Sequence, residues 1–263
     1  MSEVRLASSI EGPDGAQVLV LANSLGTTRA IWDAQARVLR DRFRLLRFEH
    51  RGHGAPGARS PAPPGPYSIA ELGTDVLGLM RDYGITTAAY CGLSLGGMMG
   101  LWLAAKAPER ISSLVVCCTA TVPMPSVQAW LDRVALARSR GMAAISEIVP
   151  PLWFTSEFIA REPAAVAYVT DMLQGTDPVG YAGCGEAIAA MDLPPALGSV
   201  KAPALIIAAT EDRAAPPWQA ATTAIGIADS RLRVIRGTAH LAPYQTPGPV
   251  TAAILGHLAP SYR

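Results

Sequence analysis

One serine of this chain lies in a pattern that could support nucleophilic catalysis. Ser94 is the central residue of Gly92-x-Ser94-x-Gly96; an apolar run precedes this motif and a helix-compatible segment follows it at 98–107. At a sharp turn from strand to helix, a serine takes a strained backbone conformation, and small neighbours relieve the crowding around it. Its hydroxyl is then exposed for attack on a carbonyl carbon. Because the motif also occurs by chance, Ser94 needs partners elsewhere in the chain.

A serine nucleophile requires a base, and the position of one histidine suits that role. His240 follows an expected strand at 231–235 after a short loop. Loops at the C-terminal ends of parallel strands meet at one edge of the sheet, where Ser94 is also expected. We therefore predict that His240 is the base; the alternative is an ordinary loop histidine. The remaining histidines lie in a glycine-rich turn or in the last helix (His50, His53 and His257).

The base in turn requires an acid that orients it. The expected strand at 204–210 ends in Glu211-Asp212, and we predict that Asp212 is the acid, because the shorter side chain one step further along can turn toward His240. The loop after the strand at 111–119 offers no carboxylate. The order Ser94, Asp212, His240 is typical of α/β-hydrolases. The alternative for Asp212 is an acid that caps a helix.

An oxyanion hole requires two backbone N–H groups. One is expected from Leu95, which follows the nucleophile at a helix N-terminus, where the helix dipole favours negative charge. The second is expected from the loop 23–28, with Leu25 as the donor; alternatively, this loop only closes a turn. With these parts, Ser94 would attack an ester or lactone carbonyl, an acyl-enzyme would form, and water activated by His240 would release the acid.

The elements that must position these residues alternate along the chain. Apolar runs rich in Val, Ile, Leu and Ala alternate with helical patterns, which predicts an α/β fold with a mostly parallel central sheet flanked by helices. A turn at 12–15 indicates an antiparallel hairpin at the sheet edge. The expected strands are 17–22, 43–49, 87–93, 111–119, 204–210 and 231–235, and the expected helices are 28–39, 69–83, 97–107, 217–227 and 249–258.

This alternation is interrupted in the middle of the chain. Residues 123–195 contain helical patterns without a strand, punctuated by prolines, which is typical of a helical cap inserted over an active site. We therefore expect a hydrolase core formed by 1–122 and 196–263. The helices expected in the cap are 127–140, 142–149, 163–173 and 177–191.

Composition excludes several classes of protein. The chain has 263 residues, of which 50% are hydrophobic, and a net charge of +1, so it is neither disordered nor a polyanion binder. No basic run interleaves with aromatic residues, so nucleic acid is not an expected partner. The N-terminus lacks an apolar signal core and no run is long enough to span a membrane, which predicts a cytoplasmic protein. The four cysteines lack metal-binding spacing, so we expect buried thiols.

Several segments of the chain resemble 3-oxoadipate enol-lactonases, α/β-hydrolases of the β-ketoadipate branch of aromatic catabolism. The resemblance covers nearly the whole chain. Its more specific parts are the Asn-Ser-Leu-Gly-Thr loop at 23–27 and the segments of the cap, since the serine and histidine motifs are common to the fold. The segments are 23–28, 51–54, 65–67, 91–97, 107–110, 153–155, 180–181, 191–193 and 239–241.

The resemblance implies hydrolysis of a small anionic enol-lactone to 3-oxoadipate, without a metal or an organic cofactor. A carboxylate on the substrate calls for a cation in the pocket, and Arg133 is our candidate, with Trp130 and Trp153 as apolar walls. The alternative for Arg133 is a solvated surface residue. The chain departs from the family at Glu186, where a smaller neutral residue is expected, and at Gln245, where the family tends to have Glu.

Two other functions remain open from the sequence. A general carboxylesterase or a cofactor-free perhydrolase of the same fold would share the triad and differ only in the pocket. A ligand-binding receptor or scaffold could also retain the triad. The sequence leaves open the oligomeric state, and whether water or another nucleophile takes the acyl group.

Overall fold

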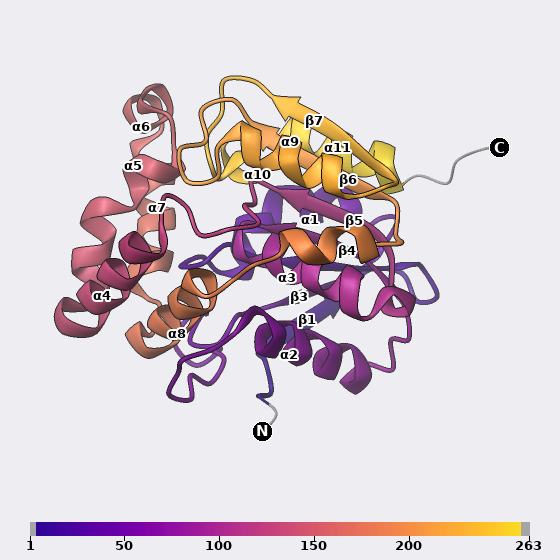
Figure 1. Ribbon diagram of the computed structural model, residues 1–263, viewed down its shortest axis with the longest axis horizontal. Helices are drawn as coiled ribbons and strands as arrows, with labels where there is room; N and C mark the ends of the chain where they lie inside the picture. The colour runs from indigo at the N-terminus through magenta and orange to yellow at the C-terminus, as the bar shows by residue number, and fades with distance from the viewer. Residues whose placement is uncertain (1–3, 259–263) are drawn as a thin grey trace.

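The computed structural model describes residues 4–258 and contains one seven-stranded sheet at its centre (Figure 1). The strand order is β1-β3-β2-β4-β5-β6-β7, and every neighbouring pair is parallel except β1 with β3. The predicted α/β fold class is therefore confirmed. The strands are β1 (Ser8–Glu11), β2 (Val18–Ala22), β3 (Arg44–Phe48), β4 (Ala88–Leu93), β5 (Ile111–Cys117), β6 (Ala204–Ala209) and β7 (Ser230–Ile235).

The predicted hairpin at the sheet edge is wrong in its partner. β1 is antiparallel and lies at the edge, but it pairs with β3, from Ser8 opposite Phe48 to Glu11 opposite Leu45, and not with the following strand β2. Both edges of β2 are occupied, by β3 and β4, and β1 pairs with the outer edge of β3. The turn crosses β3 closely, because a Cβ at Gly12 would lie 2.2 Å from the Phe43 carbonyl oxygen.

Helices cover both faces of the sheet, since every residue of β4 and β6 is buried. α2 begins with a capping box, in which the Ser68 hydroxyl accepts from the Glu71 N–H and the Glu71 carboxylate accepts from the Ser68 N–H. The core helices are η1 (Arg29–Trp32), α1 (Asp33–Leu39), α2 (Ile69–Asp82), α3 (Leu95–Lys106), η2 (Pro108–Arg110), α9 (Pro217–Gly226), α10 (Ala242–Gln245) and α11 (Pro247–Leu258).

Five helices lie between β5 and β6 and gather at one end of the molecule (Figure 1). The sequence predicted a break after residue 140, and Gly141 there has φ 72°, which kinks α4. The short helices α5 and α6 were not predicted. We propose that 123–195 acts as a cap over the core 1–122 and 196–263. Its helices are α4 (Val127–Ile148), α5 (Pro150–Trp153), α6 (Ser156–Arg161), α7 (Pro163–Gln174) and α8 (Pro178–Ala189), followed by η3 (Pro194–Ser199).

The described residues also bear on the cysteines and on membranes. All four cysteines are buried and free, as predicted. Among residues 4–258, no helix combines the length and the apolar character that crossing a bilayer requires. The expected lack of an N-terminal signal rests partly on residues 1–3, which lie outside the described range.

Candidate active site

Ser94 lies at a tight turn between β4 and α3, as the motif predicted. Its backbone has φ 53° and ψ −113°, a region that L-residues rarely occupy. The flanking glycines leave no room for side chains: a Cβ at Gly92 would lie 2.2 Å from the Gly96 carbonyl oxygen, and a Cβ at Gly96 would lie 2.5 Å from the Ala22 carbonyl oxygen. The pattern of small residues around Ser94 is therefore a steric requirement of the turn.

Thr119 supports this turn, and sequence reasoning missed it. Its hydroxyl lies 3.1 Å from the Ser94 carbonyl oxygen and 3.0 Å from the Cys117 carbonyl oxygen. The Ser94 N–H also donates to Cys117, at 2.9 Å. A Cβ at Gly97 would lie only 1.9 Å from the Thr119 hydroxyl. The residue that follows the motif must therefore also be glycine. This glycine is the signal in the sequence that a side chain packs against the turn.

The three predicted triad residues lie in one chain of hydrogen bonds. The Ser94 Oγ is 2.9 Å from His240 Nε2, and His240 Nδ1 is 2.9 Å and 3.0 Å from the two Asp212 carboxylate oxygens. The Asp212 Oδ1 also accepts from the N–H groups of Ala214 and Ala215, both at 2.8 Å. All three triad residues are buried, whereas Glu211 is exposed. This arrangement can pass a proton from the serine to the histidine and stabilise the resulting imidazolium.

The two residues predicted to supply the oxyanion hole are Leu95, which follows Ser94 in the chain, and Leu25, from the loop after β2. Leu95 is the first residue of α3, so its N–H has no acceptor within the helix. Leu25 lies in the loop 23–28 and, with Ser24, lines the same pocket as Ser94 and His240. The next N–H along that loop, from Gly26, already donates to His53 Nε2 at 2.8 Å. These positions leave Leu25 as the candidate donor from the loop.

The pocket above Ser94 is narrow and is formed by core and cap together. The free space among its walls is about 30 Å³. The three predicted pocket residues all line it. Its other walls include Met98, Ala120, Met124, Leu152 and Ile188.

Arg133 lies inside this pocket and is held in place by aromatic side chains. Its Nε donates to the Tyr181 hydroxyl at 2.6 Å, and its guanidinium lies 4.8 Å from the Trp130 ring centroid. Trp153 is buried and contributes an apolar wall, as expected. Trp130 offers more than an apolar wall, because its Nε1 is buried without a partner among the described residues. An N–H donor in this position could bind an anionic group of a ligand.

The two departures from the family lie outside this pocket. Glu186 does not line it: the carboxylate forms an ion pair with Arg138 at 2.8 Å. Gln245 joins the His240 loop to the cap. Its Nε2 donates to the Thr155 hydroxyl at 2.9 Å and to the Gly237 carbonyl oxygen at 3.4 Å, and its Oε1 accepts from the Ala239 N–H at 3.3 Å. A glutamate at position 245 could accept from the Ala239 N–H but could not donate to the Gly237 carbonyl oxygen.

His50 and His53 are buried against the loop 23–28. Burial lowers the pKa of His50 to about 4, and burial together with the neighbouring His50 lowers the pKa of His53 to about 3. Both rings are therefore neutral at physiological pH. Within residues 4–258, no group of three or more His, Cys, Asp or Glu side chains could hold a metal ion.

These depressed pKa values make a prediction about stability. Below pH 6.5 the unfolded chain protonates both histidines while the folded chain does not, so the free energy of unfolding falls by about 1.4 kcal/mol per pH unit for each of them. In His53→Gln this contribution of residue 53 is absent. We expect the stability difference between the wild type and His53→Gln, measured by urea unfolding, to shift in favour of the variant between pH 7 and pH 4.5. A difference that is constant with pH would contradict this.

Comparison with known proteins agrees with this architecture. The family model described as the alpha/beta hydrolase fold matches residues 17–247. The chain therefore belongs to the α/β-hydrolase family, and it is a hydrolase.

Within this family, the chain is similar to 3-oxoadipate enol-lactonase 2 of Acinetobacter baylyi, with 37% identity over 80% of this chain and 77% of the relative. It is also similar to the crystal structure of the enol-lactonase from Burkholderia xenovorans LB400, with 39% identity, a TM-score of 0.93, and coverage of 97% of this chain and 96% of that one. A further relative, from Variovorax paradoxus, is named as a candidate carbamate hydrolase, RutD; it is 30% identical over 80% of this chain and 79% of its own length.

Proposed function

We propose that the protein is a serine hydrolase that opens a small anionic lactone, 3-oxoadipate enol-lactone, to give 3-oxoadipate. The observation that carries the proposal is the unbroken line of hydrogen bonds from Ser94 through His240 to Asp212 at the base of a pocket that contains Arg133. The similarity to enol-lactonases over most of the chain supports the same substrate class.

The reaction has two stages. The Ser94 Oγ bonds to the lactone carbonyl carbon while its proton passes to His240 Nε2, and the oxyanion accepts from the N–H groups of Leu25 and Leu95. As the oxyanion collapses, the ring C–O bond breaks and the departing enol oxygen takes the proton from His240. Because a lactone is cyclic, the leaving group remains attached to the acyl-enzyme. Water deprotonated by His240 then attacks the acyl carbon and displaces Ser94, and the enol tautomerises to the ketone.

Arg133 and Trp130 are suited to bind the carboxylate of the substrate. Among the described residues, no carboxylate pairs with Arg133, and its guanidinium donates only through Nε, to the Tyr181 hydroxyl. The guanidinium NH₂ groups can therefore face a ligand, and Trp130, whose buried Nε1–H has no partner among the described residues, lines the same pocket. The cation–π contact holds the guanidinium in place before the substrate binds, which reduces the entropy lost on binding.

The test of the proposed function is turnover of 3-oxoadipate enol-lactone beside a panel of neutral aryl esters, a peracid assay and a small carbamate. We expect kcat/KM to be highest for the enol-lactone. A preference for neutral esters or peracid formation would favour the carboxylesterase or perhydrolase alternative, and a preference for the carbamate would favour the activity for which the RutD relatives are named. If a serine-directed fluorophosphonate fails to label the native protein, the receptor or scaffold alternative is favoured.

Arg133 makes a separate prediction within this function. Arg133→Ala removes a charged hydrogen-bond donor, so we expect KM for the anionic lactone to rise by about 10- to 100-fold, while KM for a neutral aryl ester changes by less than about 3-fold. Arg140→Ala is the matched control, because Arg140 is an exposed arginine of the same helix. Equal effects of Arg133→Ala on both substrates would contradict a carboxylate-binding role.

A further inference from the structure

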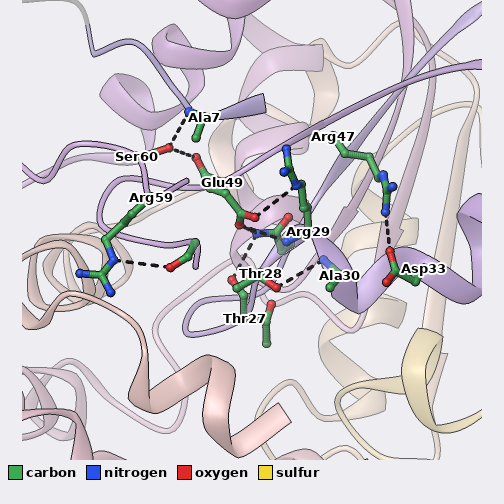
Figure 2. A network of polar contacts seen from close by, with 12 residues as sticks. Ala7, Thr27, Thr28, Arg29, Ala30, Asp33, Arg47, Glu49, Arg59 and Ser60 are labelled. Atoms are coloured by element: carbon green, nitrogen blue, oxygen red, sulfur yellow. Dashed lines mark hydrogen bonds and ion pairs between the residues drawn. The ribbon is translucent and has the colours of Figure 1, made fainter. Parts of the chain in front are cut away.

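A buried carboxylate, that of Glu49, holds both ends of the loop that contains Leu25, and Figure 2 shows its contact with Arg29 at one of these ends. The Oε2 of Glu49 accepts from the Asn23 side-chain amide at 3.4 Å and from the Arg29 N–H at 3.0 Å, and the Oε1 lies 3.6 Å from the Arg29 guanidinium. The Glu49 side chain is 4% exposed. Its own backbone is fixed, since the Ser60 hydroxyl donates to the Glu49 carbonyl oxygen at 2.7 Å. One side chain thus joins positions 23 and 29 of the loop.

Two histidines from the same segment hold the loop between these points. His53 Nε2 accepts from the Gly26 N–H at 2.8 Å, and His53 Nδ1 lies 2.9 Å from the Arg51 carbonyl oxygen. Only the neutral tautomer with its proton on Nδ1 satisfies both bonds. His50 Nε2 lies 2.7 Å from the Asn23 carbonyl oxygen. The loop is therefore attached to residues 49–53 on both sides of Leu25.

The direction of the Leu25 N–H follows from these contacts. It belongs to the same peptide group as the Ser24 carbonyl, and the two bonds of a trans peptide point in opposite directions. The Ser24 carbonyl oxygen accepts from both the N–H and the hydroxyl of Thr27, at 3.2 Å and 2.9 Å. The Thr27 carbonyl oxygen in turn accepts from the Asn23 side chain, which Glu49 also binds.

We propose that Glu49 and His53 are positioning residues for the oxyanion hole: by holding the loop 23–29, they aim the Leu25 N–H at the oxyanion formed on the substrate at Ser94. This rests on the proposed function. Neither side chain lines the pocket, so each acts through the loop and not by contact with the substrate. Misdirection of one oxyanion donor lowers the rate of both acylation and deacylation, because each stage passes through an oxyanion.

If Glu49 served only to stabilise the fold, its removal would lower the Tm, whereas the pKa of Glu49 indicates the opposite above pH 7. Burial raises the pKa of Glu49 to about 7, despite the opposing effects of the Arg29 N–H, the charges of Arg29 and Arg47, and the Asn23 amide. The unfolded carboxyl titrates near 4.5, so the contribution of this group to stability is present below that pH and is lost as the pH rises through 7. Above pH 7 the ionised Glu49 therefore destabilises the fold relative to a neutral residue of the same shape.

Glu49→Leu tests the proposal, because it removes the oxygen that accepts from both Asn23 and Arg29, and Glu71→Leu is the matched control. Glu71 lies in the capping box of α2, where its carboxylate bonds to Ser68 and not to the loop 23–29. For Glu49→Leu at pH 8, we expect kcat to fall by about 10- to 100-fold, KM to change by less than about 3-fold, and the fluorophosphonate labelling rate to fall in parallel with kcat. The Tm at pH 8 should be equal to or above that of the wild type. His53→Leu, which removes the acceptor of the Gly26 N–H, should show the same loss of kcat.

Three outcomes would overturn this inference. They are a kcat of Glu49→Leu close to that of the wild type, a loss of kcat in this variant accompanied by a lower Tm at pH 8, and an equal loss of kcat in Glu71→Leu. The labelling assay separates this inference from the proposed function. A wild type that is not labelled contradicts the hydrolase mechanism itself, whereas a wild type and a Glu49→Leu variant that are labelled at the same rate contradict only the positioning role.

Discussion

Ser94→Ala is expected to lower kcat/KM for the preferred substrate by about 10⁴- to 10⁶-fold, which leaves only the catalysis that binding and the oxyanion hole provide. The substitution removes the one oxygen that lies within hydrogen-bond distance of His240 Nε2. The backbone strain at φ 53° is the same for alanine as for serine, so the fold should be retained. Steady-state turnover and fluorophosphonate labelling followed by intact mass both measure the effect.

The exposed Ser139 provides the control for this experiment. Ser139→Ala changes the same side chain on α4, where the hydroxyl donates only to backbone carbonyls of its own helix. This variant should retain both turnover and labelling. If Ser94→Ala keeps more than about a tenth of the activity, with an unchanged Tm, the acyl-enzyme mechanism is wrong.

Asp212→Asn is expected to lower kcat by about 10⁴-fold without unfolding the protein. The asparagine oxygen can still accept from the Ala214 and Ala215 N–H groups, so the local structure has its hydrogen bonds. Its NH₂ group, however, faces His240 Nδ1 and donates to it. This places the imidazole proton on Nε2, and the ring can then no longer accept a proton from Ser94.

Glu211→Gln separates the two adjacent acids. Glu211 is exposed, and its backbone N–H donates to the Thr238 carbonyl oxygen. Because Glu211→Gln leaves this bond intact, the variant should have wild-type kcat and Tm. Progress curves for both variants at neutral pH, with circular dichroism to confirm folding, measure the difference. Comparable losses in the two variants would mean that neither carboxylate orients His240 in the way the geometry indicates.

The sequence was sufficient to predict the elements whose patterns are local. The runs that became β2, β4 and β6 are apolar because both faces of the sheet are covered there, and the predicted bounds of β2 to β7 agree with the structure to within about two residues. The pairing of β1 was not predictable in this way. Its partner β3 begins more than thirty residues further on, and the turn at 12–15 gave no sign that another strand would lie between β1 and β2. The one-turn helices α5 and α10 are too short to show a period.

The same distinction applies to the candidate site. Ser94, Asp212 and His240 could be predicted because each follows a strand, and the C-terminal ends of parallel strands meet at one edge. Glu49 and Thr119 could not, because their partners depend on which loops lie side by side in the fold. Glu186 illustrates the reverse case: the sequence marked it as a departure from the family, but the structure places it outside the pocket, paired with Arg138 on a neighbouring helix.

The contacts of Gln245 have a consequence for exchanging parts between relatives. This side-chain amide forms hydrogen bonds both to the loop that precedes His240 and to Thr155 of the proposed cap. A cap transplanted from another α/β-hydrolase would need both a donor and an acceptor opposite position 245, or the base would lose its alignment although every triad residue was retained. Chimeras designed to alter substrate range should therefore treat position 155 and position 245 as a pair that is replaced together.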